Sequence, residues 1–321
     1  MLVQEARYSM RVEEKELNSL SKSILKTLLY FNIFQYPLTR EEIHNYCSLN
    51  TSMHEISAQL EILESIGYVK KNGGFYFFKG VDEKMLLRRR IEGKKNAEKL
   101  IKTAGRFSKF ISFFPFVRGI CLSGSLSKGY ADKESDIDYF IVTVPGRLWL
   151  CRTILIIFKK LFLFNSHKYF CVNYFVDTSS LEISDKNTFT ATELVSVIPT
   201  YNSAIYQQLM LANEWAKSYF PNSELKDSTK VHPENKSSLK KKIEWIFSGK
   251  MGNKLDDKCF QLTLSQWKKK FMDFDETQFD LRLRSRKNVS KHHPNGFQEK
   301  VMKKYESGIL DFEKKYNVSL T

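Results

Sequence analysis

Two carboxylates two positions apart, Asp136 and Asp138, are the side chains whose types and spacing point most directly to chemistry. An apolar run, Tyr139 to Val142, follows them and predicts a β-strand. Because alternate residues of a strand point to one face, the two carboxylates would project together, about 7 Å apart along the strand. Such a pair can hold Mg²⁺ or Mn²⁺, with water and substrate phosphates as the remaining ligands.

A second feature is the bend Ser123-Gly124-Ser125, which comes directly after another apolar run, Gly119 to Leu122. Ten residues separate Ser125 from Asp136. Glycine lets the backbone approach a phosphate closely, and the amides and hydroxyl of this bend can bond phosphate oxygens. The chain then predicts a short helix whose N-terminal amides favour an anion, and Lys128 adds positive charge. We therefore expect a phosphate cradle and a metal site on consecutive elements.

This pattern resembles the polymerase-β-like nucleotidyltransferase superfamily, tightly over residues 117–144 and loosely over 110–230. The resemblance implies an α/β fold with a small mixed sheet and flanking helices, an NTP as donor and two divalent ions. By motif position, Gly124 and Ser125 would bind the triphosphate, and the two aspartates would bind metal. The implied activity is transfer of a nucleoside monophosphate to an acceptor hydroxyl with release of pyrophosphate.

The superfamily normally supplies a third carboxylate from the next strand, as general base and second-metal ligand. Here that strand is predicted at Lys168 to Val176. Its polar interior position is Asn173, whereas Asp177 lies at the strand end and Glu182 follows. We favour Asp177 as the third carboxylate. If Asn173 holds that position instead, the chain lacks this base and would be a nucleotide-binding regulatory protein with weak or no turnover.

The acceptor is not identified by the motif, because the motif reads only the donor nucleotide. RNA ends, a small molecule and a protein side chain all remain open as acceptors.

The elements before this segment predict three helices and a hairpin over about residues 20–80, an order that resembles a winged helix-turn-helix domain. The second helix opens at Thr39 with a capping box to Glu42. The third, Met53 to Ile66, is the one that would enter a DNA groove. It carries three glutamates and no Lys or Arg, so it would repel phosphate. We expect a packing or dimerisation role rather than DNA binding.

Four segments are expected from the order of these patterns: a winged-helix-like domain at 1–81, a basic connecting helix at 82–116, a nucleotidyltransferase domain at 117–230 and a C-terminal helical region at 231–321. The net charge is +15, and the excess lies in residues 84–118 and 231–321. Such a basic surface attracts nucleic acid, nucleotide phosphates or an acidic partner, or it is a set of solvated lysine-rich helix faces.

Several charged residues outside the motif have two interpretations. Near the C-terminus, Arg282, Arg284, Arg286 and the pair His292-His293 form either a basic surface loop or a loop that folds over the acidic site. Arg147 and Arg152 lie just beyond the second strand and either meet phosphate or are surface cations at a helix start, and we favour the surface role. We expect Glu193 to be an ordinary helix-surface charge.

Membrane and secreted classes are not expected. The most apolar stretch, Leu148 to Phe164, is interrupted by three cations, and Gln4, Glu5 and Arg7 precede no apolar signal segment. Five widely spaced cysteines without a CxxC pair favour a reducing compartment. The sequence therefore predicts a soluble cytoplasmic protein that contacts no membrane.

Overall fold

The computed structural model describes residues 17–80, 82–164, 168–229, 231–235 and 237–320, so the first sixteen residues of the expected N-terminal domain lie outside it. Among the described residues, no helix combines the length and the apolar character needed to cross a membrane.

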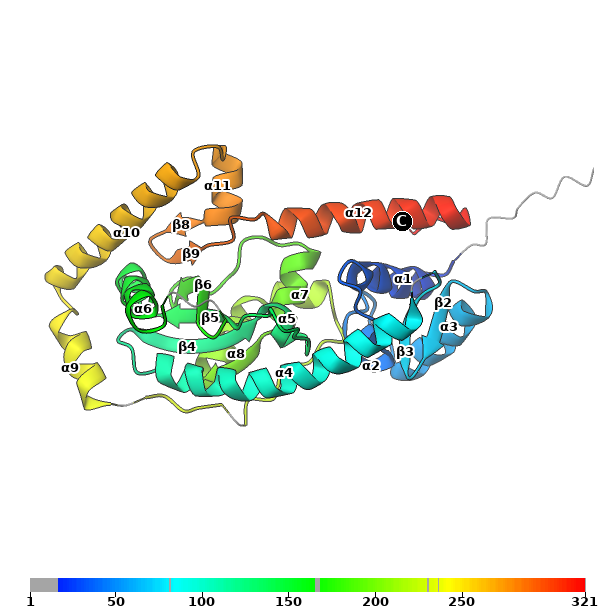
Figure 1. Cartoon of the computed structure of the whole chain (residues 1–321), viewed down its shortest axis with the longest axis horizontal. Coiled ribbons are helices and arrows are strands. Elements are labelled where there is room, and N and C mark those ends of the chain that lie inside the picture. Colours follow the sequence, from blue (N-terminus) through cyan, green and yellow to red (C-terminus); the bar gives the residue numbers. More distant parts are fainter. Residues whose placement is uncertain (1–16, 81, 165–167, 230, 236, 321) are drawn as a thin grey trace, which may run out of the picture.

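The N-terminal unit contains three helices and a three-stranded antiparallel sheet (Figure 1). In chain order its elements are α1 (Ser19–Asn32), β1 (Leu38–Thr39), α2 (Arg40–Asn45), α3 (Met53–Ser65), β2 (Val69–Asn72) and β3 (Phe75–Phe78). The predicted capping box is present, because Thr39 accepts from the Glu42 amide and Glu42 accepts from the Thr39 amide. The strand β1, which pairs with β3, is an addition to the predicted pattern.

A single helix of 29 residues, α4 (Glu83–Ile111), joins this unit to the central sheet (Figure 1). Its Arg90 is buried, donates to Glu42 Oε1 at 2.6 Å and lies 4.1 Å from the ring centroid of Tyr36. Gly93 packs against Tyr130 so closely that a Cβ would lie 2.3 Å from that ring. The predicted basic helix therefore packs at its N-terminal half rather than spanning solvent.

The central sheet is mixed and has the strand order β7-β4-β5-β6-β9-β8. Its strands are β4 (Val117–Ser123), β5 (Asp138–Thr143), β6 (Cys171–Asp177), β7 (Ile198–Tyr201), β8 (Ser285–Arg286) and β9 (Val289–Lys291). Only the β5–β6 pair is parallel among these described strands, and the others are antiparallel.

Helices cover both faces of the sheet, which confirms the predicted mixed α/β class (Figure 1). They are α5 (Gly124–Ser127), α6 (Leu148–Phe162), α7 (Thr188–Ser196), α8 (Ser203–Ala212) and the 3₁₀ helix η1 (Glu214–Ser218). Alternate residues of β5 separate the two cores: Tyr139 packs with α4 and α6, whereas Phe140 packs with α7 and α8. Asp138 follows this alternation and lies on the α7 side of the sheet.

The C-terminal segment divides among these parts. Its helices are α9 (Ser238–Ile246), α10 (Lys250–Lys270), α11 (Glu276–Leu283) and α12 (Phe297–Tyr316). Helix α10 packs on α6, and the hairpin β8–β9 extends the central sheet beside β6. Helix α12 runs back to the N-terminal unit, where Phe312 lies in the same apolar cluster as α1 and α3 (Figure 1).

Candidate functional site

The carboxylates of Asp136 and Asp138 lie together at the start of β5. One oxygen from each and the Cys171 sulfur are all within 4.8 Å of one another, which is a spacing that one metal ion can bridge. Register explains the arrangement, because Asp138 is opposite Ser123 of β4 on one side and opposite Cys171 of β6 on the other. The two aspartates are half-buried and Cys171 is buried.

The bend between β4 and α5 lies directly against this pair. Gly124 has φ +70°, and a Cβ at that position would lie 2.5 Å from Asp138 Oδ2. Glycine is therefore required twice, for the left-handed backbone and for the close approach of the carboxylate. Ser125 is exposed beside it, and within the described chain its hydroxyl has no hydrogen-bond partner. The predicted helix is only four residues long, so the bend rather than a helix terminus presents the amides.

Lys128 holds this bend in place. Its Nζ lies 2.7 Å from Glu193 Oε1 on α7 and donates to the Gly124 carbonyl at 3.1 Å. The ammonium predicted to meet phosphate is thus already bonded within the protein. Glu193 is correspondingly half-buried and ion-paired, which corrects its interpretation as an ordinary helix-surface charge.

Asn173 occupies the position where a third carboxylate was considered. The ladder between β5 and β6 shifts here, since Val172 is opposite Tyr139 and Tyr174 is opposite Phe140, which leaves Asn173 as the extra residue of a bulge. Its Nδ2 donates to Cys171 Sγ at 2.9 Å and lies 3.5 Å from Asp138 Oδ1. The amide therefore orients two of the clustered groups and brings no negative charge of its own.

The favoured third carboxylate, Asp177, is not brought to the pair. It is six residues beyond Cys171 on β6, about 20 Å away at the usual rise of a strand. There it is opposite Thr143 and accepts from the amide and hydroxyl of Ser179. Glu182 is exposed and paired with Lys186. The register of the parallel strands thus places Asp177 at the opposite end of β6, and we withdraw it from the site.

The electrostatics of the cluster favour a bound cation. Burial raises the pKa of Asp138 to about 7, and the neighbouring charges of Asp136 and Glu193 act in the same direction. Burial raises the pKa of the Cys171 thiol, and the neighbouring Asp138 and Asp136 raise it further. A divalent cation would remove this repulsion, because it favours the ionised carboxylates that burial disfavours.

The predicted basic C-terminal loop is an ordered part of the sheet edge. Arg282 pairs with Glu299, and Arg284 is buried between Asp185 and Asp280. Burial lowers the pKa of His292 to about 3 and of His293 to about 4, so both rings are neutral near pH 7. The His292 amide donates to the Asn173 carbonyl at 2.9 Å, which places this segment beside the cluster.

Both arginines expected on the surface at the start of α6 are buried. Arg147 donates to the carbonyls of Phe247 and Ser248 and to Asn253, so it anchors the α9–α10 connection. Arg152 stacks on Trp267 and is only 8% exposed. The cause is α10, which covers this part of α6 and could not be foreseen from the local pattern.

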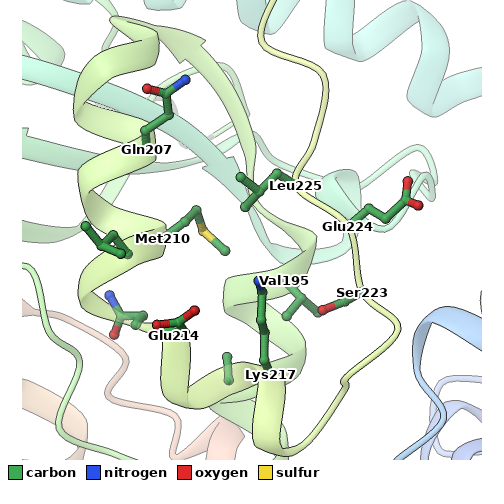
Figure 2. A pocket seen from close by; sticks show the side chains of 11 residues that line it. Val195, Gln207, Met210, Glu214, Lys217, Ser223, Glu224 and Leu225 are labelled. Atoms are coloured by element: carbon green, nitrogen blue, oxygen red, sulfur yellow. The ribbon is translucent and has the colours of Figure 1, made fainter. Parts of the chain in front are cut away.

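A separate pocket of about 300 Å³ lies between α7, α8 and η1 (Figure 2). Met210 of α8 and Leu225 contribute to its mostly apolar lining, and Glu224 points away from it. None of its lining residues belongs to the carboxylate cluster.

Comparison with protein-family models, with curated proteins and with solved structures found no match. The assignment of this site therefore depends on its own geometry.

Cys171 and Glu193 are the members of the site that the sequence did not identify. Cys171 could have been found from register, because a strand parallel to β5 that begins near Phe170 places it opposite Asp138. Glu193 had no comparable signal, since its contact with Lys128 joins residues 65 positions apart.

Proposed function

We propose that the chain is a nucleotidyltransferase that binds an NTP with a divalent cation, Mg²⁺ or Mn²⁺, and transfers its nucleoside monophosphate to an acceptor hydroxyl. The observation that carries the proposal is the convergence of the bend and the carboxylates. Asp138 packs against Gly124 and lies with Asp136 in one potential metal cluster. A phosphate cradle beside paired carboxylates is the arrangement that nucleotidyl transfer needs.

The chain's own groups have distinct roles in this proposal. The backbone at Gly124 and the exposed Ser125 hydroxyl bind triphosphate oxygens, and Asp136 and Asp138 hold the cation. Lys128 and Glu193 keep the bend against α7. When bound, the cation neutralises the triphosphate and stabilises the pyrophosphate leaving group. The thiol of Cys171 is a poor ligand for Mg²⁺, so the fit depends on the two carboxylates.

A second candidate function is nucleotide binding without turnover, and Asn173 favours it. An amide cannot take a proton from an attacking hydroxyl, and Asp177 lies too far away to do so. The N-terminal unit, which we interpret as a winged helix, would then report the bound state by its contacts with the central part, such as that of Tyr36 with the Lys128 carbonyl.

The experiment combines binding and turnover. Wild type is titrated with each of the four NTPs plus Mg²⁺ or Mn²⁺ by calorimetry, and pyrophosphate release is followed with candidate acceptors. Cation-dependent binding with release supports the transferase, and binding without release supports the regulatory function. Absence of binding for every NTP would refute both.

The key variant is Asp136→Asn with Asp138→Asn, because it removes both charges with little change of shape. Loss of cation-dependent binding is expected, and unchanged binding would contradict the site. The matched control is Asp273→Asn, an exposed aspartate in the turn between α10 and α11. The control should bind NTP as wild type does.

A further inference from the structure

Arg152 is a buried cation that has no counter-charge among the described residues. Its side chain is 8% exposed, and its guanidinium lies 4.7 Å from the ring centroid of Trp267 and 5.8 Å from that of Trp149. Within the described residues it makes no hydrogen bond and no ion pair. Burial lowers the pKa of Arg152 to about 10, with no acidic group opposing this effect. A buried arginine normally has a carboxylate or a set of carbonyl acceptors, as Arg284 and Arg147 have here.

A second cation and a histidine ring lie near Arg152. Lys159 follows Arg152 by two turns on the same face of α6 and is 4% exposed. The ring of His292 lies 4.7 Å from the ring of Trp267. Because this ring is neutral near pH 7, it offers one N–H donor. We call Arg152, Lys159 and His292 the α6 cluster.

The α6 cluster lies on the α6 face of the sheet, whereas Asp138 lies on the α7 face, and the two come nearest to each other on the β6 side of Asp138. The strand order places Gly124 on the β4 side of Asp138, whereas β6 and β9 lie on the other side. His292 is fixed to Asn173 by its amide, and Asn173 in turn lies 3.5 Å from Asp138. Burial lowers the pKa of Lys159, and its neighbours Cys171 and Asp136 act in the opposite direction, which places this end of α6 near the carboxylate site.

We propose that the α6 cluster is an anion subsite that binds a phosphate or carboxylate group of the acceptor. This inference rests on the proposed transferase function, since it assigns the charged group of the second substrate to the α6 face of the sheet, on the β6 side of the carboxylates and away from the triphosphate cradle on the β4 side. The acceptor is then an acidic molecule with a hydroxyl, and Trp267 supplies a flat apolar wall beside its charged group.

The energetic reason is the missing counter-charge. An uncompensated buried cation costs free energy, and a bound anion would recover that cost through charge-assisted hydrogen bonds to a guanidinium. Access is not sealed. Arg152 is 8% exposed, so it is not fully closed off from solvent.

The test uses inorganic phosphate and acetate as probes, with chloride at equal ionic strength as reference. Phosphate or acetate should raise the melting temperature of wild type and of Lys160→Gln, whose lysine is the exposed neighbour on the same helix. For Arg152→Gln we expect binding weaker by about tenfold or more. Without the probe, this variant should melt at the same temperature as wild type or higher, because removing an unpaired buried charge costs nothing.

Three results would overturn the proposal. Wild type could fail to respond to either probe beyond chloride. Arg152→Gln could respond as wild type does. It could also melt several degrees lower while keeping the response, which would make Arg152 a packing residue. Should Arg152→Gln not fold, Arg152→Lys carries the test: it keeps the charge and must retain a measurable response.

Measuring NTP binding in the same variants shows whether the bound anion belongs to the nucleotide or to the acceptor. If Arg152→Gln weakens NTP binding as much as phosphate binding, the subsite holds nucleotide phosphates and the acceptor assignment is wrong. If wild type binds phosphate but no NTP, the proposed function fails while the anion site itself remains.

Discussion

Gly124 is the residue on which the geometry of the site depends most. A Cβ at Gly124 would strain the left-handed backbone and would also meet Asp138. Gly129 has a similar φ of +73° and nothing within 4 Å, so a Cβ there would cause the backbone strain alone. Gly129→Ala should cost about 1–2 kcal/mol of unfolding free energy from backbone strain alone. Gly124→Ala should cost more, because the carboxylate must also move.

We therefore predict that Gly124→Ala weakens cation-dependent NTP binding by about tenfold or more, whereas Gly129→Ala leaves it unchanged. Denaturant unfolding gives the stabilities and calorimetry gives the affinities. Equal losses of affinity in the two variants would show that backbone strain, and not contact with Asp138, controls the site.

Asp138 also predicts a pH dependence of stability. Its pKa is raised to about 7 in the folded protein, so the folded state keeps a proton that the unfolded state has lost above about pH 4. This contribution is fully present below pH 4 and disappears as pH rises through about 7. Stability of the cation-free protein should therefore fall between pH 5 and 8, and Asp138→Asn should flatten this decline.

Melting temperatures measured across that range test the prediction, with Asp273→Asn as the exposed control. Added Mg²⁺ or Mn²⁺ should restore stability mainly at the upper end, where the carboxylate is ionised. An identical slope in Asp138→Asn and in wild type would assign the dependence to other groups.

The sequence predicted the paired aspartates and the bend because each depends on local spacing. The two-residue spacing predicted that Asp136 and Asp138 lie together, although β5 begins only at Asp138, and glycine marks the bend. The prediction of the third carboxylate was wrong for a non-local reason. The register of β6 against β5, together with a bulge, decides which of Asp177, Glu182 and Asn173 approaches the two aspartates. The residues of β6 alone predict neither the register nor the bulge.

At the scale of elements, the hairpin β8–β9 shows how a basic segment can be structural. The three arginines that the sequence left open between a surface loop and a loop over the acidic site are paired with the protein's own carboxylates, as is Lys291. The arginines are Arg282, Arg284 and Arg286. The starts of α2 and α3 and the hairpin of the N-terminal unit were predicted well, because caps and turns are local signals. The hairpin β8–β9 was missed because its partners lie over a hundred positions away.

We predict that Arg284→Ala destabilises the protein by about 3 kcal/mol, because it leaves Asp185 with one partner and opens a buried network. Arg286→Ala is the control within the same hairpin. Its side chain is 58% exposed, so the loss should stay below about 1 kcal/mol. Denaturant unfolding measures both values, and similar losses would show that the buried network adds nothing beyond a surface pair.

At the scale of the whole molecule, two long helices link the N-terminal unit to the central sheet. Helix α4 leaves the unit and α12 returns to it from the far end of the chain (Figure 1). The boundary expected at residue 231 therefore separates segments that share cores with earlier parts of the chain. Local patterns could not reveal this, because an amphipathic helix does not specify which surface receives its apolar face.

The return of α12 predicts that a C-terminal substitution loosens the N-terminal unit. Phe312 is 5% exposed and contacts Tyr68 and Phe78, with ring centroids 5.6 Å and 5.5 Å away. Phe312→Ala should cost about 3 kcal/mol through a cavity between α12 and this unit. Leu310, on the same helix but 55% exposed, is the control, and Leu310→Ala should change stability by less than about 0.5 kcal/mol.

Amide hydrogen exchange locates the effect. In Phe312→Ala, exchange should quicken in α1, in α3 and in α12 itself, while the central strands β4, β5 and β6 keep their protection. Cation-dependent NTP binding should persist, because Asp136, Asp138 and Gly124 belong to that protected sheet edge. Faster exchange confined to α12 would mean that the N-terminal unit holds together without it, and equal changes in Leu310→Ala would remove the role given to Phe312.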